Sequence, residues 1–513
     1  MYTIRRLQQL QKTFFPYNFW VSQKQHHCCS QVDQAEPIMT GADPVLLSLR
    51  LPLTVIAVLV SIFWIYGRKK GRHSKLPPGD KRWPFIGSTF SPFESHPVTT
   101  LADFLNIQFF RYGKIFTTRY RGKPLVISAD PEFNRFVFQN ELTLFQNDLP
   151  SGFRTIVGEG SIPFLAGETY RRARSLKHAF INSWQVQTRF LADVEEAVER
   201  VMTSWRQKSL IMANEEISKF LFNLTIEKSM GTAADDPEVV ELRKAFIAVN
   251  NGIYAAPLNL PFTRYSKALK ARDIICNIIK RKAEDRKLNI DKMDEKESDL
   301  IWYYLKNDPS MPIQSVCGAI IGFVFAALFN TQNSIALAIY FLGQCPKSLQ
   351  QLRDEFKKKM NDTDTTKKLT WDDYKNMEFC QSVINETLRL GNIVPRLWRK
   401  TLSDINYKGY IIPQGTTIMT HIAAMHLDPS AFENPDIFHP WRWLAIKKSN
   451  NWMPFGGGVR HCLGSEIARI QITVFLRHLI LNHDYELVGP DHPVACPLVQ
   501  FPKGLPITIH PLG

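Results

Sequence analysis

The chain has 513 residues, of which 44% are hydrophobic and 12% aromatic, so it can bury a large core and is not intrinsically disordered. Lysine plus arginine outnumber aspartate plus glutamate by 63 to 48, a net charge of +15. No basic stripe interleaved with stacking aromatics, zinc-finger spacing or helix-turn-helix signature accompanies this charge, so nucleic acid is not an expected partner.

The first predicted element is a membrane-spanning helix over residues 45–66. This stretch is almost entirely apolar, contains Arg50 as its only charged residue, and is long enough to cross the hydrocarbon core. A basic and proline-rich linker, residues 67–80, comes directly after it, and the positive-inside rule places such a segment in the cytosol. A buried core helix or a signal peptide is disfavoured by this basic stop and by the length of the apolar run. We therefore expect a single-pass anchor followed by one cytosolic catalytic domain, residues 81–513.

The N-terminal extension, residues 1–44, has no assigned role. It could be a short lumenal tail or a weak targeting sequence, or Met39 could be the true start of the protein. The histidine and cysteine pairs at 26–29 lack the second half of a metal site. The eight cysteines of the chain do not have the dense, regular spacing of a disulfide scaffold, which favours a reducing compartment.

The catalytic part is predicted to be mainly α with small β-sheets. Helical periodicity dominates from about residue 165 to 390, and a last helix begins near Ser465. Alternating apolar and polar residues predict strands around Ile115–Ile127, Tyr485–Val488 and Leu505–Ile509, and turn-rich sequence fills Asn406–Pro454.

The most specific segment of the chain is Phe455–Gly464, with the sequence FGGGVRHCLG. Its glycines let the backbone turn tightly and approach a flat ligand closely. Cys462 stands just before a helix, whose amino-terminal dipole favours an anion, and a thiolate is a ligand for iron. Arg460 can neutralise a haem propionate, and Phe455 can pack beside the sulfur and restrict water.

This segment fills every fixed position of Phe-x-x-Gly-x-Arg-x-Cys-x-Gly and resembles that of cytochrome P450 enzymes. Glu386 and Arg389 share one face of a helix, and Arg442 resembles the third member of the family's structural Glu-Arg-Arg cluster. The resemblance covers about residues 76 to 513 and implies the cytochrome P450 fold. It also implies haem b, with Cys462 as the iron ligand and a set of further haem-binding residues: Arg460, Phe455, Arg174, Arg399, Gly456 and Gly464.

The family's oxygen-activating helix corresponds to Gly322–Thr331, where the chain departs from the usual Ala-Gly-x-Asp/Glu-Thr pattern. Our preferred register places Ala326 and Ala327 in the two small-residue positions, Phe329 at the acid and Asn330 at the threonine. Phe329 cannot organise proton delivery, whereas the amide of Asn330 can still hold a water.

An alternative register, shifted by one residue, makes Asn330 the acid and Thr331 the alcohol. It also puts Leu328 where a small residue must leave room for dioxygen. We take Asn330 and Thr331 as the candidate catalytic residues.

The leading functional interpretation is a monooxygenase that oxidises a hydrophobic polycyclic substrate with dioxygen. Electrons would come from NADPH through NADPH-cytochrome P450 reductase. The carboxy-terminal half resembles the plant branch that oxidises sterols, brassinosteroids and other terpenoids, which implies a sterol, triterpenoid or diterpenoid substrate. The alternative, a haem-thiolate isomerase or dehydratase acting without reductase, is suggested by Phe329 and Asn330. A non-catalytic haem or lipid-binding protein has no positive feature in the sequence.

The resemblance also implies where the partners bind. An endoplasmic reticulum membrane would hold the anchor, and basic residues would steer an acidic reductase to the thiolate side. We expect these basic residues to include Arg171, Arg172, Lys177, Lys447 and Lys448. The family's substrate-contact regions map onto four largely apolar segments: Phe145–Ile162, Phe323–Asn330, Ile393–Leu397 and Leu498–Gln500.

Overall fold

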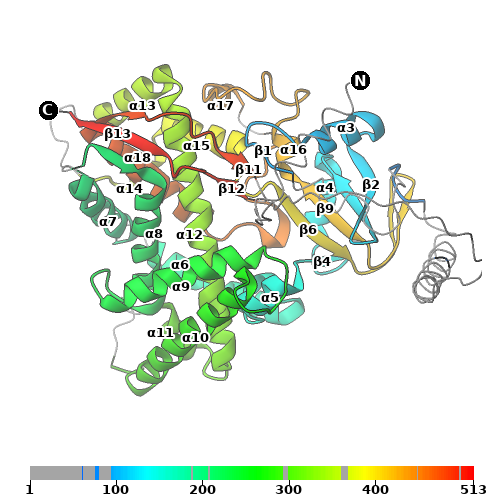
Figure 1. Ribbon diagram of the computed structural model, residues 1–513, viewed down its shortest axis with the longest axis horizontal. Coiled ribbons are helices and arrows are strands. Elements are labelled where there is room, and N and C mark those ends of the chain that lie inside the picture. Colours follow the sequence, from blue (N-terminus) through cyan, green and yellow to red (C-terminus); the bar gives the residue numbers. More distant parts are fainter. Residues whose placement is uncertain are drawn as a thin grey trace, which may run out of the picture. The chain divides into compact units, whose positions relative to one another are not determined.

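The structure is a computed structural model that describes residues 61, 75–79, 94–185, 189–205, 208–292, 299–359, 368–446, 449–495 and 498–512. The chain divides into two units, Met1–Gly71 and Arg72–Gly513. Of the first unit only Ser61 is described, so the predicted extension and anchor lie outside the described residues. The same holds for most of the linker and for Lys447 and Lys448. The helices and strands labelled in Figure 1 all belong to the second unit.

A five-stranded sheet forms one side of this unit, with strand order β2-β3-β9-β6-β4 (Figure 1). Strands β3 and β9 run parallel, while the other neighbours are antiparallel. The five strands are β2 (Ile115–Tyr120), β3 (Lys123–Ser128), β4 (Phe145–Asn147), β6 (Arg396–Thr401) and β9 (Thr417–His421).

Helices cover both faces of this sheet. The buried side chains of β3 show this, because they alternate between two apolar clusters, one on each face. Leu125 and Ile127 pack in one apolar cluster with Leu105 of α3 (Asp103–Tyr112). Val126, between them, packs in another cluster with Phe133 of α4 (Pro131–Gln139). Because successive side chains of a strand point to opposite faces, a run of buried residues marks a strand that is covered on both sides.

Smaller sheets complete the β structure of the described residues. Their strand orders are β1-β11-β12, β10-β13-β5 and β7-β8. The strands are β1 (His96–Pro97), β5 (Leu210–Met212), β7 (Ile405–Tyr407), β8 (Tyr410–Ile412), β10 (His483–Leu487), β11 (Val494–Ala495), β12 (Val499–Gln500) and β13 (Pro506–Pro511). The strands expected near residues 115–127, 485–488 and 505–509 are thus confirmed.

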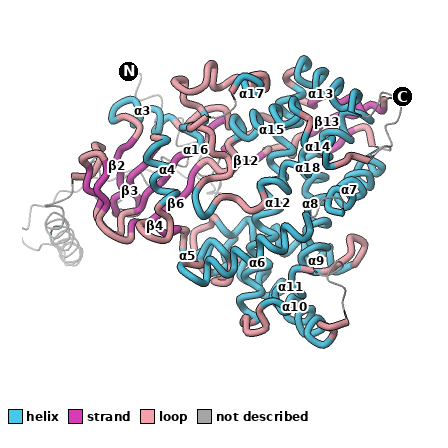
Figure 2. The backbone as a smooth tube through the Cα atoms, turned by 180° about the vertical axis from the view of Figure 1, so that it is seen from behind, coloured by secondary structure: helices cyan, strands magenta, loops and turns pink. Residues whose placement is uncertain are grey.

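The helices make up the rest of the unit (Figure 2). The longer ones are α6 (Gly167–Gln185), α7 (Arg189–Trp205), α8 (Ala213–Met230), α9 (Pro237–Ile253), α10 (Arg264–Leu288), α12 (Ile313–Gly343), α13 (Pro346–Lys359), α15 (Glu378–Gly391) and α18 (Ser465–Asn482). Shorter ones are α5 (Ser151–Val157), α11 (Leu300–Asn307), α14 (Trp371–Lys375), α16 (Ile422–His426), α17 (Arg442–Ala445) and the 3-10 turns η2 (Ile162–Phe164) and η4 (Gly458–Arg460). The mainly α class predicted from the sequence is confirmed.

Helix α12 is the central element of the helical part. It packs against α8, α10, α15 and α18, and most of its side chains belong to the largest hydrophobic cluster. Among the described helices it alone is long and apolar enough to cross a membrane. Contacts with other helices on several sides identify it as a core helix, and they make any exposed position along it informative.

Candidate active site

The loop that carries Cys462 has the tight backbone that its glycines allow. Gly456 and Gly458 have φ values of 68° and 63°, in the left-handed region that favours glycine. A Cβ on Gly458 would also lie 1.9 Å from the carbonyl oxygen of Phe138 at the end of α4. The backbone N–H of Cys462 donates to the carbonyl of Phe455 over 3.1 Å, which closes the loop. The predicted need for glycines here is therefore steric as well as conformational.

Cys462 is exposed but lies close to protein on several sides. Its side chain is exposed, yet the surrounding protein desolvates it enough to raise the pKa of the thiol. The backbone N–H of Gly464, which caps α18, and the positive charge of Arg174 act in the opposite direction. A bound metal ion would outweigh these effects, because coordination deprotonates a thiol outright.

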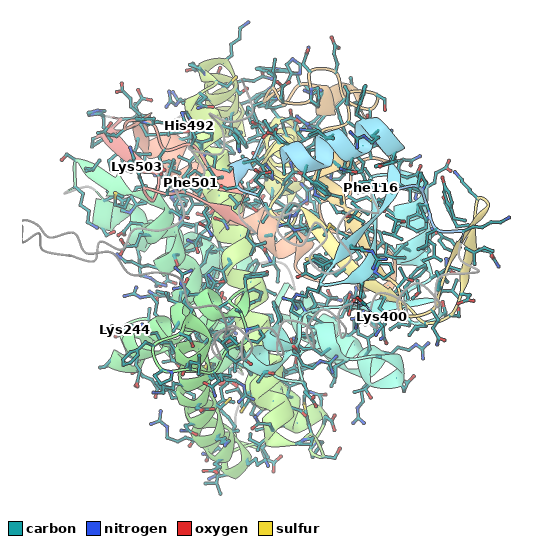
Figure 3. The ribbon with its side chains drawn as sticks, turned by 45° about the vertical axis from the view of Figure 1, so that its right-hand side comes forward. Phe116, Lys244, Lys400, His492, Phe501 and Lys503 are labelled. Atoms are coloured by element: carbon teal, nitrogen blue, oxygen red, sulfur yellow. The ribbon has the colours of Figure 1, made fainter. Side chains whose placement is uncertain are left out.

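The middle of α12 lies beside the chain that leads into α18, as the sequence colouring in Figures 1 and 3 shows. Ala326 is exposed although α12 is otherwise a core helix. One turn later, the side-chain Nδ2 of Asn330 donates to the carbonyl of Ala326 over 3.1 Å. Leu328 and Thr331 are buried. The open face of α12 therefore carries Ala326 and Asn330, whereas Thr331 of the alternative register is buried.

Helix α6 is fastened directly to the cysteine loop. Tyr170 is buried, and its hydroxyl donates to the carbonyl of Val459 over 2.7 Å. One turn later, Arg174 donates to the carbonyl of His461 over 2.8 Å and to the Tyr170 hydroxyl over 3.3 Å. The guanidinium of Arg460 stacks on the Tyr170 ring, 4.1 Å from its centre. Tyr170 thus orders two of the predicted haem-binding arginines, Arg174 and Arg460.

A buried carboxylate, Glu141, joins Arg460 to the third predicted arginine, Arg399. Its Oε1 accepts from the Nε of Arg460 over 2.7 Å, and its Oε2 accepts from the Nε of Arg399. Burial lowers the pKa of Arg399, while Glu141 raises it again. Glu141 was missed in the sequence. The signal for an acidic residue here was the prediction of three arginines in one interior site, because buried positive charges need a negatively charged partner.

The Glu-Arg-Arg cluster is assembled as predicted. Glu386 and Arg389 are fully buried, and two nitrogens of Arg389 donate to the two carboxylate oxygens over 2.9 Å each. Arg442, the Trp443 indole and the His439 backbone N–H also donate to Glu386 over 2.9–3.0 Å. Burial alone would raise the pKa of Glu386, but the hydrogen bonds and charges of the two arginines outweigh it and leave the pKa below its usual value.

Aromatic side chains from two predicted substrate-contact regions meet beside α12. The Phe153 ring of α5 lies 5.5 Å from that of Phe325, which lies 5.6 Å from Phe329. Tyr254, after α9, also touches Phe153, with 6.2 Å between ring centres. Phe329, which the preferred register places at the position of the acid, therefore belongs to an aromatic wall.

The expected surface position of Lys177 is wrong. Lys177 is buried, and its Nζ donates to the carbonyl of Ala319 in α12 over 3.3 Å and lies 5.8 Å from the centre of the Phe323 ring. The reason is helical spacing, because residues 170, 174 and 177 share the face of α6 that turns inward. Arg171 and Arg172 lie on the outer face and are exposed.

A family model described as Cytochrome P450 matches residues 77–503, most of the chain. The chain belongs to the cytochrome P450 family. It is accordingly a monooxygenase, an oxidoreductase, and the family predicted from the cysteine loop is confirmed.

Full-length relatives of this P450 are plant sterol hydroxylases. A cholesterol 22-hydroxylase of Paris polyphylla is 40% identical over 479 residues, covering 91% of this chain and 99% of the relative. A cholesterol 16,22-dihydroxylase of Trigonella foenum-graecum is 40% identical over 469 residues, covering 89% and 96%. A steroid (22S)-hydroxylase of Brachypodium distachyon is 40% identical over 457 residues, covering 87% and 90%. The expected resemblance to the plant sterol-oxidising branch is confirmed.

Among solved structures, a cyanobacterial P450 bound to retinoic acid matches with a TM-score of 0.74 at 23% identity. The match covers 86% of this chain and 100% of that one. It shows that the two share a fold.

The P450 family implies haem, and the residues of this chain fit it. Cys462 is exposed, and the core helix α12 exposes Ala326, so neither position is filled by side chains of the protein and a planar group can lie against both. Arg174 donates to the carbonyl of His461 in the cysteine loop. Arg460, which belongs to that loop, and Arg399 both donate to Glu141. Guanidinium groups of this kind suit the two carboxylates of haem.

Proposed function

We propose that this P450 hydroxylates a sterol, with dioxygen as the oxidant and with electrons passed from NADPH by NADPH-cytochrome P450 reductase. The observation that carries the proposal is the identity of 40%, extended over nearly the full length, to plant enzymes that act on cholesterol or steroids. The names of the three relatives share carbon 22. Carbon 22 of the sterol side chain is therefore the position that we expect to be oxidised.

The aromatic wall supports a rigid, apolar substrate. The rings of Phe325 and Phe329 are partly exposed and present apolar surface beside the open face of α12, and the buried ring of Phe153 packs behind Phe325. Each square ångström of apolar surface that a substrate buries there contributes about 25 cal/mol. A polycyclic sterol loses little conformational entropy on binding, so more of this energy remains as affinity.

We assign the positioning of the catalytic water to Asn330. Haem, when bound through the Cys462 thiolate, supplies the activation of dioxygen, and proton delivery is left to the protein. One N–H of the Asn330 amide is used by the carbonyl of Ala326. The second N–H and the amide oxygen can hold a water, although the amide cannot itself supply a proton. Thr331 lies buried behind this face and remains the second candidate. We expect oxygen insertion with some loss of electrons to peroxide.

The surface supports the proposed reductase and membrane contacts. Arg171 and Arg172 stand on the outer face of the helix that is bonded to the cysteine loop, where they can steer an acidic partner. Leu258, Leu260 and Phe262, between α9 and α10, are 57%, 58% and 91% exposed. Large apolar side chains gathered in one turn are typical of a membrane contact. We place the catalytic domain on the cytosolic face of the endoplasmic reticulum membrane, held by a single-pass anchor at residues 45–66.

The proposal is tested by purifying the enzyme and assaying a panel of sterols, triterpenoids and diterpenoids with and without reductase. We expect a sterol to accelerate NADPH consumption and to yield a hydroxylated product only when reductase is present. Product formation that does not need oxygen or NADPH would establish the isomerase or dehydratase alternative. Tight sterol binding without any product would indicate a binding protein.

A further inference from the structure

We propose that Glu141 is a positioning residue for haem: it holds Arg399 and Arg460 so that both face the haem propionates, and it sets the charge of the site that receives them. The inference rests on the propionate-binding roles proposed for these two arginines. It does not depend on which substrate the enzyme oxidises.

The contacts of Glu141 are arranged to orient two guanidinium groups at once. Its side chain is 1% exposed, and each carboxylate oxygen accepts from one arginine Nε. Because Glu141 accepts from the Nε of each arginine, the Nη groups of both arginines can donate to other acceptors. Those of Arg460 donate to the carbonyls of Ile162 and Leu165 over 3.2 and 2.8 Å. A guanidinium has five N–H groups, so each arginine keeps donors for an incoming carboxylate.

The three structural parts that meet at Glu141 are the ones that must meet around haem. Glu141 comes shortly after α4, Arg399 lies on β6, and Arg460 lies in the cysteine loop. The Phe138 ring of α4 lies under the Arg399 guanidinium, 5.6 Å away. Gly458 packs against the carbonyl of the same Phe138. A single carboxylate thus fixes the sheet and the cysteine loop relative to each other.

Charge balance gives the second reason for an acid at this position. The positive charges of Arg399 and Arg460 repel each other in the interior. Arg174, Arg399 and Arg460 together carry three positive charges, and Glu141 reduces the total to two. Haem carries two propionates, whose two negative charges equal the net charge of these four side chains. Without Glu141 one positive charge would remain uncompensated near the iron, in a medium where charges interact strongly.

The test compares Glu141→Gln and Glu141→Asp with the wild-type protein, all loaded with haem and measured without sterol or reductase. Glu132→Gln is the matched control, because Glu132 lies on α4 but is exposed and pairs with Lys408 at the surface. The measurements are the rate of haem transfer to an excess of apomyoglobin and the midpoint potential of the iron. Thermal unfolding of each variant is recorded alongside.

We expect haem transfer from Glu141→Gln to be at least about tenfold faster, which corresponds to about 1.4 kcal/mol. The midpoint potential should shift to more positive values, because a negative charge has been removed near the iron. Glu141→Asp should keep the wild-type potential and lose haem at an intermediate rate, and Glu132→Gln should match the wild type in both.

A Glu141→Gln protein with lowered thermal stability but an unchanged potential and transfer rate would show a merely structural role. If Glu141→Gln does not fold, unchanged haem transfer in Glu141→Asp overturns the proposal. A wild-type protein that takes up no haem would instead refute the haem assignment itself, and an inactive but normally loaded protein would refute the proposed substrate.

Discussion

Replacing Lys177 by methionine should stabilise this protein. Lys177 is 6% exposed, and its ammonium lies between the carbonyl of Ala319 and the ring of Phe323. Within the described residues no carboxylate forms an ion pair with it. A buried charge that is paired only with a carbonyl dipole and a ring is costly. Methionine has a similar length and fills the same space without the charge.

The expected gain is calculated from the pKa of the lysine. Burial lowers the pKa of Lys177 from 10.5 to about 8. A pKa difference of about 2.5 corresponds to about 3.5 kcal/mol, at about 1.4 kcal/mol for each pKa unit. Loss of the hydrogen bond to Ala319 removes about 1 kcal/mol of this, which leaves a net gain of about 2.5 kcal/mol at pH 7.

The pH dependence has a defined sign. The folded-state pKa of Lys177 lies below its unfolded value, so the unfolded state binds more protons between about pH 8 and pH 10.5. The cost of the buried charge is therefore fully present below pH 8 and disappears as the pH rises through this window. The advantage of Lys177→Met over the wild type should shrink accordingly between pH 7 and pH 9.5.

Urea unfolding followed by tryptophan fluorescence at pH 7 and pH 9.5 measures both effects. Lys244→Met is the control, since Lys244 is exposed on α9 (Figure 3), and its free energy of unfolding should change by less than about 0.5 kcal/mol. A Lys177→Met protein that is less stable than the wild type at pH 7 would refute the cost assigned to the buried charge. A difference between the two proteins that is the same at both pH values would refute it as well.

Three further predictions concern the site. Cys462→Ser should lose the strongly red-shifted Soret band of the reduced carbon monoxide complex, since thiolate donation causes that shift; a histidine-type spectrum in the wild type would contradict the thiolate assignment. Glu386→Gln should lower the free energy of unfolding by about 3–5 kcal/mol, because two buried arginines lose their anion, whereas exposed Glu378→Gln on the same helix should cost less than about 1 kcal/mol in the same urea experiment. Asn330→Ala should raise the peroxide formed per NADPH and Asn330→Thr should keep product formation, as measured by peroxide and product yields; unchanged coupling in Asn330→Ala would exclude the proposed role.

The parts of the site that were predictable are local in sequence. The glycine loop around Cys462 and the pair of Glu386 and Arg389 each lie within one short segment, so turn and helix rules determine their geometry. Ala326 and Asn330 are four residues apart, so helix geometry places them on one face of α12. Ala326 is exposed there.

The parts that were missed depend on contacts distant in sequence. Glu141 is 258 positions from Arg399 and 319 from Arg460, and no local pattern links them. The position of Lys177 was misjudged for another reason. It was grouped with Arg171 and Arg172 by charge, although its spacing from Tyr170 and Arg174 places it on the opposite face of α6. Periodicity should have taken precedence over composition there.

The proposed hydroxylation of a sterol by this P450 is tested most directly with labelled dioxygen. The purified enzyme, reductase and NADPH are incubated with cholesterol under ¹⁸O₂, and the products are analysed by mass spectrometry. We predict one ¹⁸O atom in a hydroxyl group at carbon 22, formed only when both oxygen and NADPH are present. A product without label, or one formed equally well without oxygen and NADPH, would contradict the proposed hydroxylation.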